Sequence, residues 1–383
     1  MNDIRRIMVL GAGDLGRRVF HELAQGDRGR HVRLLGRDPE TTLRAANSAG
    51  FCALQRGHGA QVSHALTDLT DTDRTAQEIA AFRPDVLFLA VSYQSWWQIS
   101  TLPEDAFKRL YAANFGPWLP MHLVPVLHAM RAVRAAGSDA TVVNAAFPDA
   151  VHPVLAAAGL APHIGIGNVA NNVPALRTAA ARQLGLDVAD IDVRLVAHHY
   201  VSHRLSRHGD SGPARMGLSV HYAGEDVTAK ADVPELLRWL PADYRRTGGL
   251  AGQTMTAASA LSVLEPLVDG RDAHVHAPGP DGRVGGYPVA IESGRFRLLL
   301  PDGMTEDEAV AINLSGQRAD GITEIRPDGT VVFEPAAMGV LTDALGYACE
   351  RMPLGEAEDR AREIAERYAH FRDRSCERAE ALR

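Results

Sequence analysis

A glycine-rich stretch near the start of the chain constrains the fold more than any other feature. Residues 9–16 read VLGAGDLG, in which Gly11, Gly13 and Gly16 form the pattern G-x-G-x-x-G. An apolar run over 7–10 precedes the glycines, and a helical pattern over 15–24 follows them. In such a strand–turn–helix unit the first glycine permits a tight turn. The second lets a pyrophosphate approach the backbone, and the third lets the helix pack closely on the strand.

The position of this motif predicts a dinucleotide site whose phosphates face the N-terminus of the first helix. We expect the backbone of one continuous segment to form it: Gly11, Ala12, Gly13, Asp14, Leu15 and Gly16. The alternative is a glycine turn in an α/β protein that binds nothing.

Strands alternate with helices through the first 150 residues. Further strand patterns cover 31–35, 62–66, 86–91 and 141–143, and helical patterns cover 40–49, 72–82 and 104–136. Pro117, Pro120 and Pro125 are expected to break or bend the last of these helices. The alternation predicts an α/β fold, with a Rossmann-type doubly wound parallel sheet over residues 1–150.

The pattern changes after about residue 150. Strand patterns cover 163–166, 191–197, 217–222, 273–276, 287–291, 296–300 and 330–333, and helical patterns cover 170–184, 233–245, 254–268 and 356–372. We therefore expect residues 151–383 to form a mixed α+β substrate domain, which no linker separates from the first domain.

Composition excludes several classes of protein. The formal net charge of -7 leaves no basic stripe for nucleic acid. Cys52, Cys349 and Cys376 are scattered, which argues against a disulfide framework or a zinc site and fits a reducing compartment. The apolar runs fall far short of the roughly 20 residues that cross a membrane. The first strand pattern begins so early that we expect no signal peptide and a cytoplasmic protein.

The end of the second strand bears on the choice of cofactor. A carboxylate at that place binds the ribose 2′-hydroxyl of NAD, but here Gly36 occupies it and Arg37 follows. A small residue followed by arginine accommodates a 2′-phosphate, so we expect NADP rather than NAD. Two alternatives stay open: Asp38 takes the ribose role, or Arg37 is a solvated loop residue.

Several short motifs follow one another in a characteristic order. Asn114 follows an aromatic loop, VVNAAFP over 142–148 contains Asn144, and IGIGN covers 164–168. Asn172 comes next, His199 lies 27 residues farther on, and AGQT over 251–254 ends in Thr254. This order resembles the lactate/malate dehydrogenase superfamily. The resemblance implies cofactor contacts from Asn114 and Asn144, a substrate contact from Thr254, and a homodimer or homotetramer.

The resemblance also implies an acid/base pair. A histidine beside a nicotinamide supplies or removes the proton that accompanies hydride transfer, and here it would be His199. The orienting partner is a carboxylate in the family but would be Asn172 here, or Asn171 in a shifted register. Two alternatives stay open: His199 binds backbone only, or His208 in the family-like RHGDSGP segment is the acid/base.

The substrate-binding arginines of the family are mostly missing. Ala175 stands where a bidentate arginine would hold a carboxylate, and Phe107 stands near the place of the second arginine, beside Lys108 and Arg109. Aromatic residues fill the loop after the fourth strand instead: Tyr93, Trp96 and Trp97. We expect them, Trp96 above all, to cover a larger and less charged substrate, with plain packing as the alternative.

These observations predict an NAD(P)-dependent dehydrogenase or reductase. Its substrate would be a carbonyl, alcohol or imine metabolite other than lactate or malate. One alternative is a non-catalytic NADP-binding or sensing protein. Another is a glycoside hydrolase using NAD and a metal held by His198, His199 and His203, although the metal-binding cysteine of those enzymes has no counterpart here. We expect a small-molecule substrate and no bound metal.

Overall fold

A parallel sheet forms the first half of the molecule. The computed structural model describes residues 5–57 and 59–381. The sheet contains β1 (Arg5–Leu10), β2 (Arg30–Gly36), β3 (Gln61–Leu66), β4 (Val86–Leu89), β5 (Thr141–Asn144) and β6 (Ile164–Gly165). Its order, β3-β2-β1-β4-β5-β6, is that of a Rossmann fold. All four residues of β4 are buried, as expected for a central strand covered on both faces.

Helices connect these strands. They are α1 (Asp14–Ala24), α2 (Pro39–Gln55), α3 (Thr72–Phe82), α4 (Trp96–Ile99), α5 (Glu104–Tyr111), α6 (Leu119–Ala135) and α7 (Pro148–Ala156). The helical region over 104–136 is divided between α5 and α6, as its prolines predicted, although α6 continues through Pro125. Asn114 adopts a left-handed conformation with φ of 57°, and Pro117 opens a 3-10 turn over Gly116–Trp118. Pro120 is accommodated in the first turn of α6, where its missing N–H has no helical partner to lose.

The second half contains three small antiparallel sheets. They are β7 (Ile191–Val196) with β8 (Gly217–Tyr222) and β9 (Glu225–Asp226), β10 (Ala273–Pro278) with β11 (Gly286–Glu292) and β12 (Arg295–Leu298), and β13 (Ile322–Ile325) with β14 (Val331–Phe333) and β15 (Arg351–Met352). The helices are α8 (Val173–Leu184), α9 (His199–His208), α10 (Val233–Ala242), α11 (Gln253–Asp269), α12 (Glu306–Ala319), α13 (Pro335–Leu345) and α14 (Ala357–Ala381). The sequence patterns did not predict α9, α12, α13 or β13.

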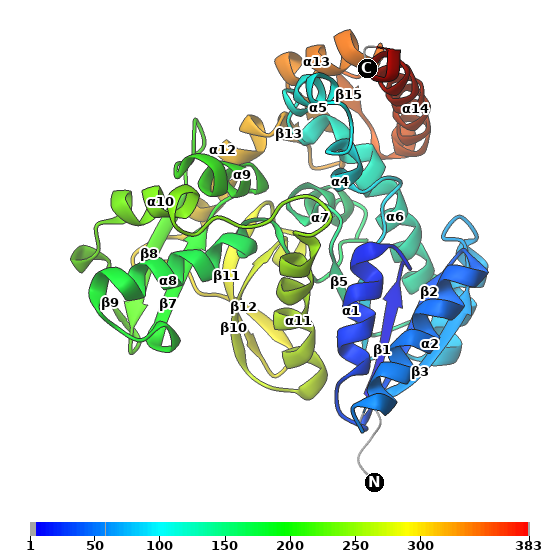
Figure 1. Ribbon diagram of the computed structural model, residues 1–383, viewed down its shortest axis with the longest axis horizontal. Helices are drawn as coiled ribbons and strands as arrows, with labels where there is room; N and C mark the ends of the chain where they lie inside the picture. Colours follow the sequence, from blue (N-terminus) through cyan, green and yellow to red (C-terminus); the bar gives the residue numbers. More distant parts are fainter. Residues whose placement is uncertain (1–4, 58, 382–383) are drawn as a thin grey trace.

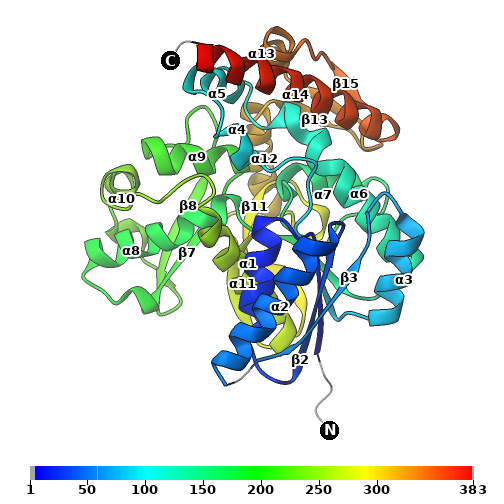
Figure 2. The same cartoon turned by 45° about the vertical axis from the view of Figure 1, so that its right-hand side comes forward.

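The two halves share their hydrophobic cores. Leu341, Ile364 and Tyr368 from the end of the chain pack in the same core as Leu87 and Leu127 from the first half. Figures 1 and 2 show α13 and α14 together at one end of the molecule, next to α5 and α6. The chain thus returns to the parallel sheet after crossing the α+β part, and β6 joins that sheet beyond residue 150. The division into 1–150 and 151–383 stays a prediction. Within the described ranges, no helix is both long and apolar enough to cross a bilayer.

Candidate active site

The glycine turn between β1 and α1 is built so that only glycine fits at two positions. Gly11 has φ of 109°, and a Cβ atom there would lie 2.3 Å from the carbonyl oxygen of Ala90. A Cβ on Gly16 would lie 1.8 Å from the carbonyl oxygen of Gly11. Gly13 differs, because a Cβ atom there would meet no atom within 4 Å. The motif therefore packs turn, helix and strand together and leaves free space in front of Gly13.

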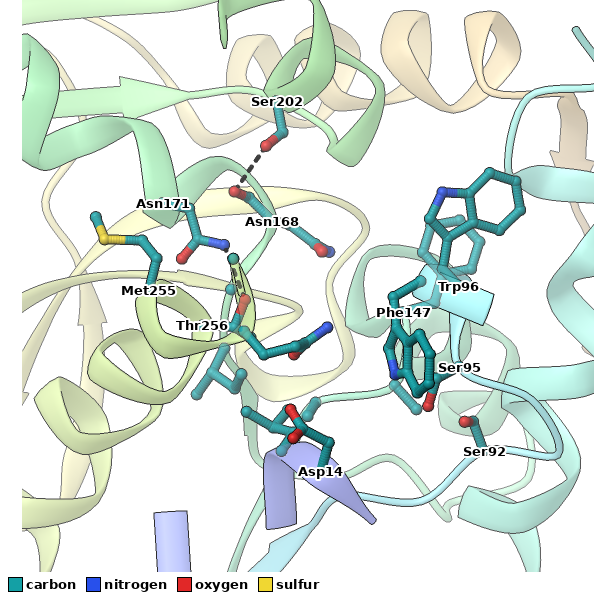
Figure 3. A pocket seen from close by; sticks show the side chains of 18 of the residues that line it. Asp14, Ser92, Ser95, Trp96, Phe147, Asn168, Asn171, Ser202, Met255 and Thr256 are labelled. Atoms are coloured by element: carbon teal, nitrogen blue, oxygen red, sulfur yellow. Dashed lines mark hydrogen bonds between the residues drawn. The ribbon is translucent and has the colours of Figure 1, made fainter. Parts of the chain in front are cut away.

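Two cavities meet at this free space. Both are lined by Gly13 and by Ala90 after β4. One extends along the end of β2 and is lined by Gly36, Arg37, Asp38, Thr41 and neighbouring residues. The other, which we call the inner cavity, extends from Gly13, Asp14 and Leu15 to His199. Figure 3 shows Asn168, Asn171 and Thr256 on one side of the inner cavity and Trp96 and Phe147 on the other.

His199 lines the inner cavity as the first residue of α9, three residues after β7 ends. Its backbone N–H donates to Oδ1 of Asp149 at 2.8 Å. Its Nδ1 donates to Oδ2 of Asp320 at 2.7 Å, because a carboxylate can only accept. The ring packs against Phe115 at 4.7 Å and Phe147 at 5.2 Å between centroids. These contacts fix the orientation of the ring and keep a proton on Nδ1. Nε2 is therefore the nitrogen that can release or take up a proton.

Charge couples His199 to Asp320. Burial alone would lower the pKa of His199, but the charge and hydrogen bond of Asp320 raise that pKa above its usual value. Burial alone would raise the pKa of Asp320, but the charge and hydrogen bond of His199 lower it. Only 7% of His199 and 2% of Asp320 is exposed, so water screens this attraction weakly. The pair favours an imidazolium beside a carboxylate.

The predicted pairing of His199 with Asn172 is wrong. The Asn172 amide donates to Oγ of Ser202 at 3.0 Å, and its oxygen accepts from Nη2 of Arg246 at 3.0 Å. The amide therefore joins α9 to the Arg246 loop and does not orient the imidazole. Asn171 does not orient it either, since its amide donates to Oγ1 of Thr256 at 3.4 Å. The orienting position is taken by a carboxylate, that of Asp320, which lies directly after α12.

Three other residues predicted for the site, Asn114, Asn144 and His208, do not line the two cavities that meet at the glycine turn. Asn144 is fully buried, and its side chain bonds to both the N–H and the carbonyl of Ala146. Asn114 lines a third cavity, which His199 and Asp320 also line. His208 is exposed at the other end of α9 and lines that third cavity too. The structure thus brings none of these three side chains to the cavities that meet at the glycine turn.

The rotation of α11 about its axis turns Thr254 away from the inner cavity. Its hydroxyl accepts from Nη1 of Arg18 at 3.2 Å, in a groove between α1 and α11. Thr256 lines the inner cavity instead. Trp96 and Trp97 line the inner cavity, and Tyr93 lines the cavity near Arg37. That they cover a substrate stays a prediction. Trp96 also packs edge-on against Phe115 at 4.8 Å, so cavity wall and core packing coincide in this ring.

Sequence reasoning missed three residues: Asp320, Arg246 and His122. Arg246 lines the inner cavity from the loop between α10 and α11, and its guanidinium donates to the carbonyl of Asn171 as well as to Asn172. Although the residue as a whole is exposed, the protein around the guanidinium partly desolvates it and lowers its pKa. Local patterns could not reveal these residues, since each reaches the site from a distant part of the chain.

The metal-site alternative has no ligand set in the structure. Within residues 5–57 and 59–381, no three His, Cys, Asp or Glu side chains are grouped so that they could hold a metal ion. The neighbouring histidines are engaged otherwise: Nδ1 of His198 accepts from the N–H of Tyr200, and His203 packs edge-on against His199 at 5.3 Å. The three histidines therefore do not converge on one point.

Solved structures with a similar fold include lactate and malate dehydrogenases. The malate dehydrogenase of Cryptosporidium parvum matches with a TM-score of 0.54 and 15% identity, over 82% of this chain and 96% of that one. The lactate dehydrogenase of that organism, solved with lactic acid and NAD, matches with a TM-score of 0.56 and 17% identity, over 84% and 96%. The lactate dehydrogenase of Eimeria maxima, solved with NADH and oxamate, matches with a TM-score of 0.54 and 13% identity, over 83% of this chain and 93% of that one.

No family model matches the chain, and no curated protein matches it in sequence. The chain therefore has the fold of the lactate and malate dehydrogenases, as the sequence motifs predicted. At these identities the likeness establishes the fold, and the reaction has to be argued from the site itself.

Proposed function

We propose that the protein is an NADP-dependent oxidoreductase that uses His199 as its acid/base. Its substrate would be a carbonyl, alcohol or imine metabolite other than lactate or malate. The observation that carries the proposal is that one cavity joins Gly13, at the N-terminus of α1, to a histidine whose protonated form a buried carboxylate stabilises.

The residues present fit a dinucleotide. The space in front of Gly13 is free, and the N-terminus of α1 borders it, which is the arrangement that accepts a pyrophosphate. A bound nicotinamide would supply or accept the hydride. In the direction of reduction, Nε2 of His199 would donate its proton to the substrate oxygen, and Asp320 would hold the ring throughout. In the reverse direction the same nitrogen would take up the proton of the alcohol.

The preference for NADP rests on the end of β2. A Cβ atom on Gly36 would lie 2.2 Å from Oγ1 of Thr42, so this position holds no carboxylate for the ribose of NAD and could take a side chain only if Thr42 moved. Arg37 is exposed at the same cavity and supplies a cation for a 2′-phosphate. Asp38 also lines this cavity, but its Oδ1 caps α2 by accepting from the N–H of Thr41 at 2.7 Å.

The wall of the inner cavity supports a substrate other than lactate or malate. Trp96, Phe115 and Phe147 present aromatic surface beside His199. Arg246 is the arginine at this cavity, and it could hold one acidic group of the substrate. We therefore favour a bulky carbonyl or alcohol compound with no more than one acidic group, bound between the aromatic rings and Arg246.

The first experiment separates cofactor binding from folding. Gly13→Val places a branched side chain in the free space, so it should abolish binding of NADPH and NADH, measured by fluorescence, and leave the melting temperature nearly unchanged. Gly339→Val is the matched control, because a Cβ on Gly339 of α13 also meets no atom within 4 Å. Unchanged NADPH binding by the Gly13 variant would refute the proposed dinucleotide site.

The second experiment tests the reaction. Wild-type protein and NADPH are incubated with phenylpyruvate, phenylacetone and a wider set of aldehydes, ketones and 2-oxo acids, and loss of NADPH absorbance is followed. Turnover by the wild-type protein that disappears in the His199→Gln variant would support the proposed oxidoreductase activity. Tight cofactor binding without turnover of any compound would favour the sensing protein instead.

A further inference from the structure

His122 is a buried histidine with no assigned role in the reaction proposed above. It lies on α6, is 7% exposed and lines the inner cavity together with His199. Among the residues that the structure describes, no hydrogen bond to its ring nitrogens is found, and its neighbours are the rings of Phe115 at 4.8 Å and Phe147 at 6.4 Å. Neither ring nitrogen is among the fully buried unpaired atoms, so both keep some exposure, and a partner for them would come from the cavity.

The surroundings of His122 keep it uncharged. Burial, and then the charge of His199, lower the pKa of His122 to about 3. His203 also lines the inner cavity, and burial and His199 likewise lower its pKa to about 3. Arg246 is the other cation at this cavity. His203 sits one turn after His199 on α9, whereas His122 approaches the cavity from a different element, α6.

Within the described residues, α5 supplies no hydrogen-bond donor or cation to the inner cavity. A carbonyl that accepts hydride reacts faster when a hydrogen bond or cation polarises its oxygen. Phe107 is apolar, Lys108 pairs with Glu104, and Arg109 donates to the backbone carbonyl of Asp343 at 2.7 Å. None of these three lines the inner cavity within the described part of the chain.

We propose that His122 is a second catalytic residue, whose neutral imidazole donates a hydrogen bond to the reacting oxygen of the substrate. This inference rests on the proposed oxidoreductase function. During reduction the carbonyl carbon would receive the hydride and the oxygen would receive the proton from Nε2 of His199. His122 would keep its own proton and only stabilise the charge that develops on the oxygen. The site would thus pair a charged imidazole that transfers a proton with a neutral one that does not.

Activity measurements test the role of His122 with three variants. His122→Phe keeps a ring against Phe115 but removes the donor, His122→Gln keeps a donor, and His64→Gln changes an exposed histidine on β3 as the control. For phenylacetone or phenylpyruvate with NADPH, we expect the phenylalanine variant to lose about 100-fold in kcat, as when one oxyanion-hole donor is removed. The glutamine variant should recover part of this loss, and the control should equal wild type.

The pH profile distinguishes this role from a structural one. Because His122 is uncharged in the working range, the phenylalanine variant should lose rate without moving the apparent pKa of kcat/KM or the KM for NADPH. A moved apparent pKa, or a kcat within about twofold of wild type, would overturn the proposal, since one hydrogen bond to a transition state is worth far more than twofold.

A spectroscopic measurement keeps the two proposals separable. Protein labelled with 15N-histidine is mixed with NADP⁺ and phenylacetone, which cannot react with each other, and the His122 ring signals are assigned by their loss in His122→Phe. We expect these signals to shift when phenylacetone is added, in wild type and in the inactive His199→Gln variant. If wild type turns over no compound, the proposed reaction fails while this shift still tests His122. Absence of the shift would overturn the role of His122.

Discussion

Replacing Asp320 by asparagine should separate the charge of this residue from its shape. Asparagine has a single acceptor oxygen, which can accept from the N–H of Phe115, 3.2 Å from Oδ1 of Asp320. Its amide can then donate to Nδ1 of His199 only when that nitrogen carries no proton. The carboxylate charge would be lost while the burial of His199 remains, so the pKa of His199 should fall below its usual value. The hydrogen bond between the two side chains would also weaken, and a hydrogen bond to a charged group contributes about 1.5–3 kcal/mol.

The sign of the accompanying stability change follows from the same coupling. The pKa of His199 is raised in the folded protein. The ion pair therefore contributes its full stabilisation of the fold below the unfolded-state pKa of His199. This contribution is lost as the pH rises through the folded-state pKa. The pKa of Asp320 is lowered, so its contribution is present above its unfolded pKa and disappears as the pH falls through its folded value. Asp320→Asn should therefore destabilise the fold by about 1.5–3 kcal/mol near pH 6, the usual worth of a hydrogen bond to a charged group, and by less near pH 9.

Three measurements check this prediction. Histidine NMR gives the pKa of His199, urea unfolding gives stability at both pH values, and kcat/KM for reduction against pH gives the activity. Reduction needs protonated His199, so its high-pH limb should move to lower pH, with a loss of roughly 100- to 10,000-fold at neutral pH. Asp343→Asn, an exposed site, is the control. An unchanged pKa of His199 would refute the coupling.

Three further predictions concern the cofactor and the substrate. Arg37→Met should weaken the binding of NADPH by about 1.5–3 kcal/mol, or roughly 10- to 100-fold in Kd, and leave the Kd for NADH unchanged. Equal effects on the binding of both cofactors would contradict a 2′-phosphate contact. His199→Gln should abolish turnover and His208→Gln should preserve it, and kinetics with the reverse pattern would move the acid/base to His208. Thr256→Val should raise the KM for the carbonyl substrate more than Thr254→Val, because only Thr256 lines the inner cavity; similar KM values would argue against the assigned wall.

Local sequence signals predicted the parts of the fold whose cause is local. The glycine turn follows from Gly11 and Gly16, where a side chain would collide with backbone, and the buried strand β4 follows from its apolar run. The place of His199 near the end of β7 was also predictable, because the strand pattern ends there. These features depend on residues only a few positions apart.

Contacts between distant segments could not be read in the same way. Asp320 lies 121 residues after His199, and no spacing rule connects a residue following α12 with one beginning α9. The choice between Thr254 and Thr256 depends on the rotation of α11, since two positions along a helix turn a side chain to another face. Asn144 matched a family position but is used to fix the backbone of Ala146 after β5.

A crystal structure of the protein with NADPH would show whether the cofactor lies between the glycine turn and His199. We expect the pyrophosphate in front of Gly13, the 2′-phosphate beside Arg37, and the nicotinamide ring in the inner cavity facing His199. A dinucleotide bound elsewhere, or one whose nicotinamide ring lies outside the inner cavity and away from His199, would contradict this expectation.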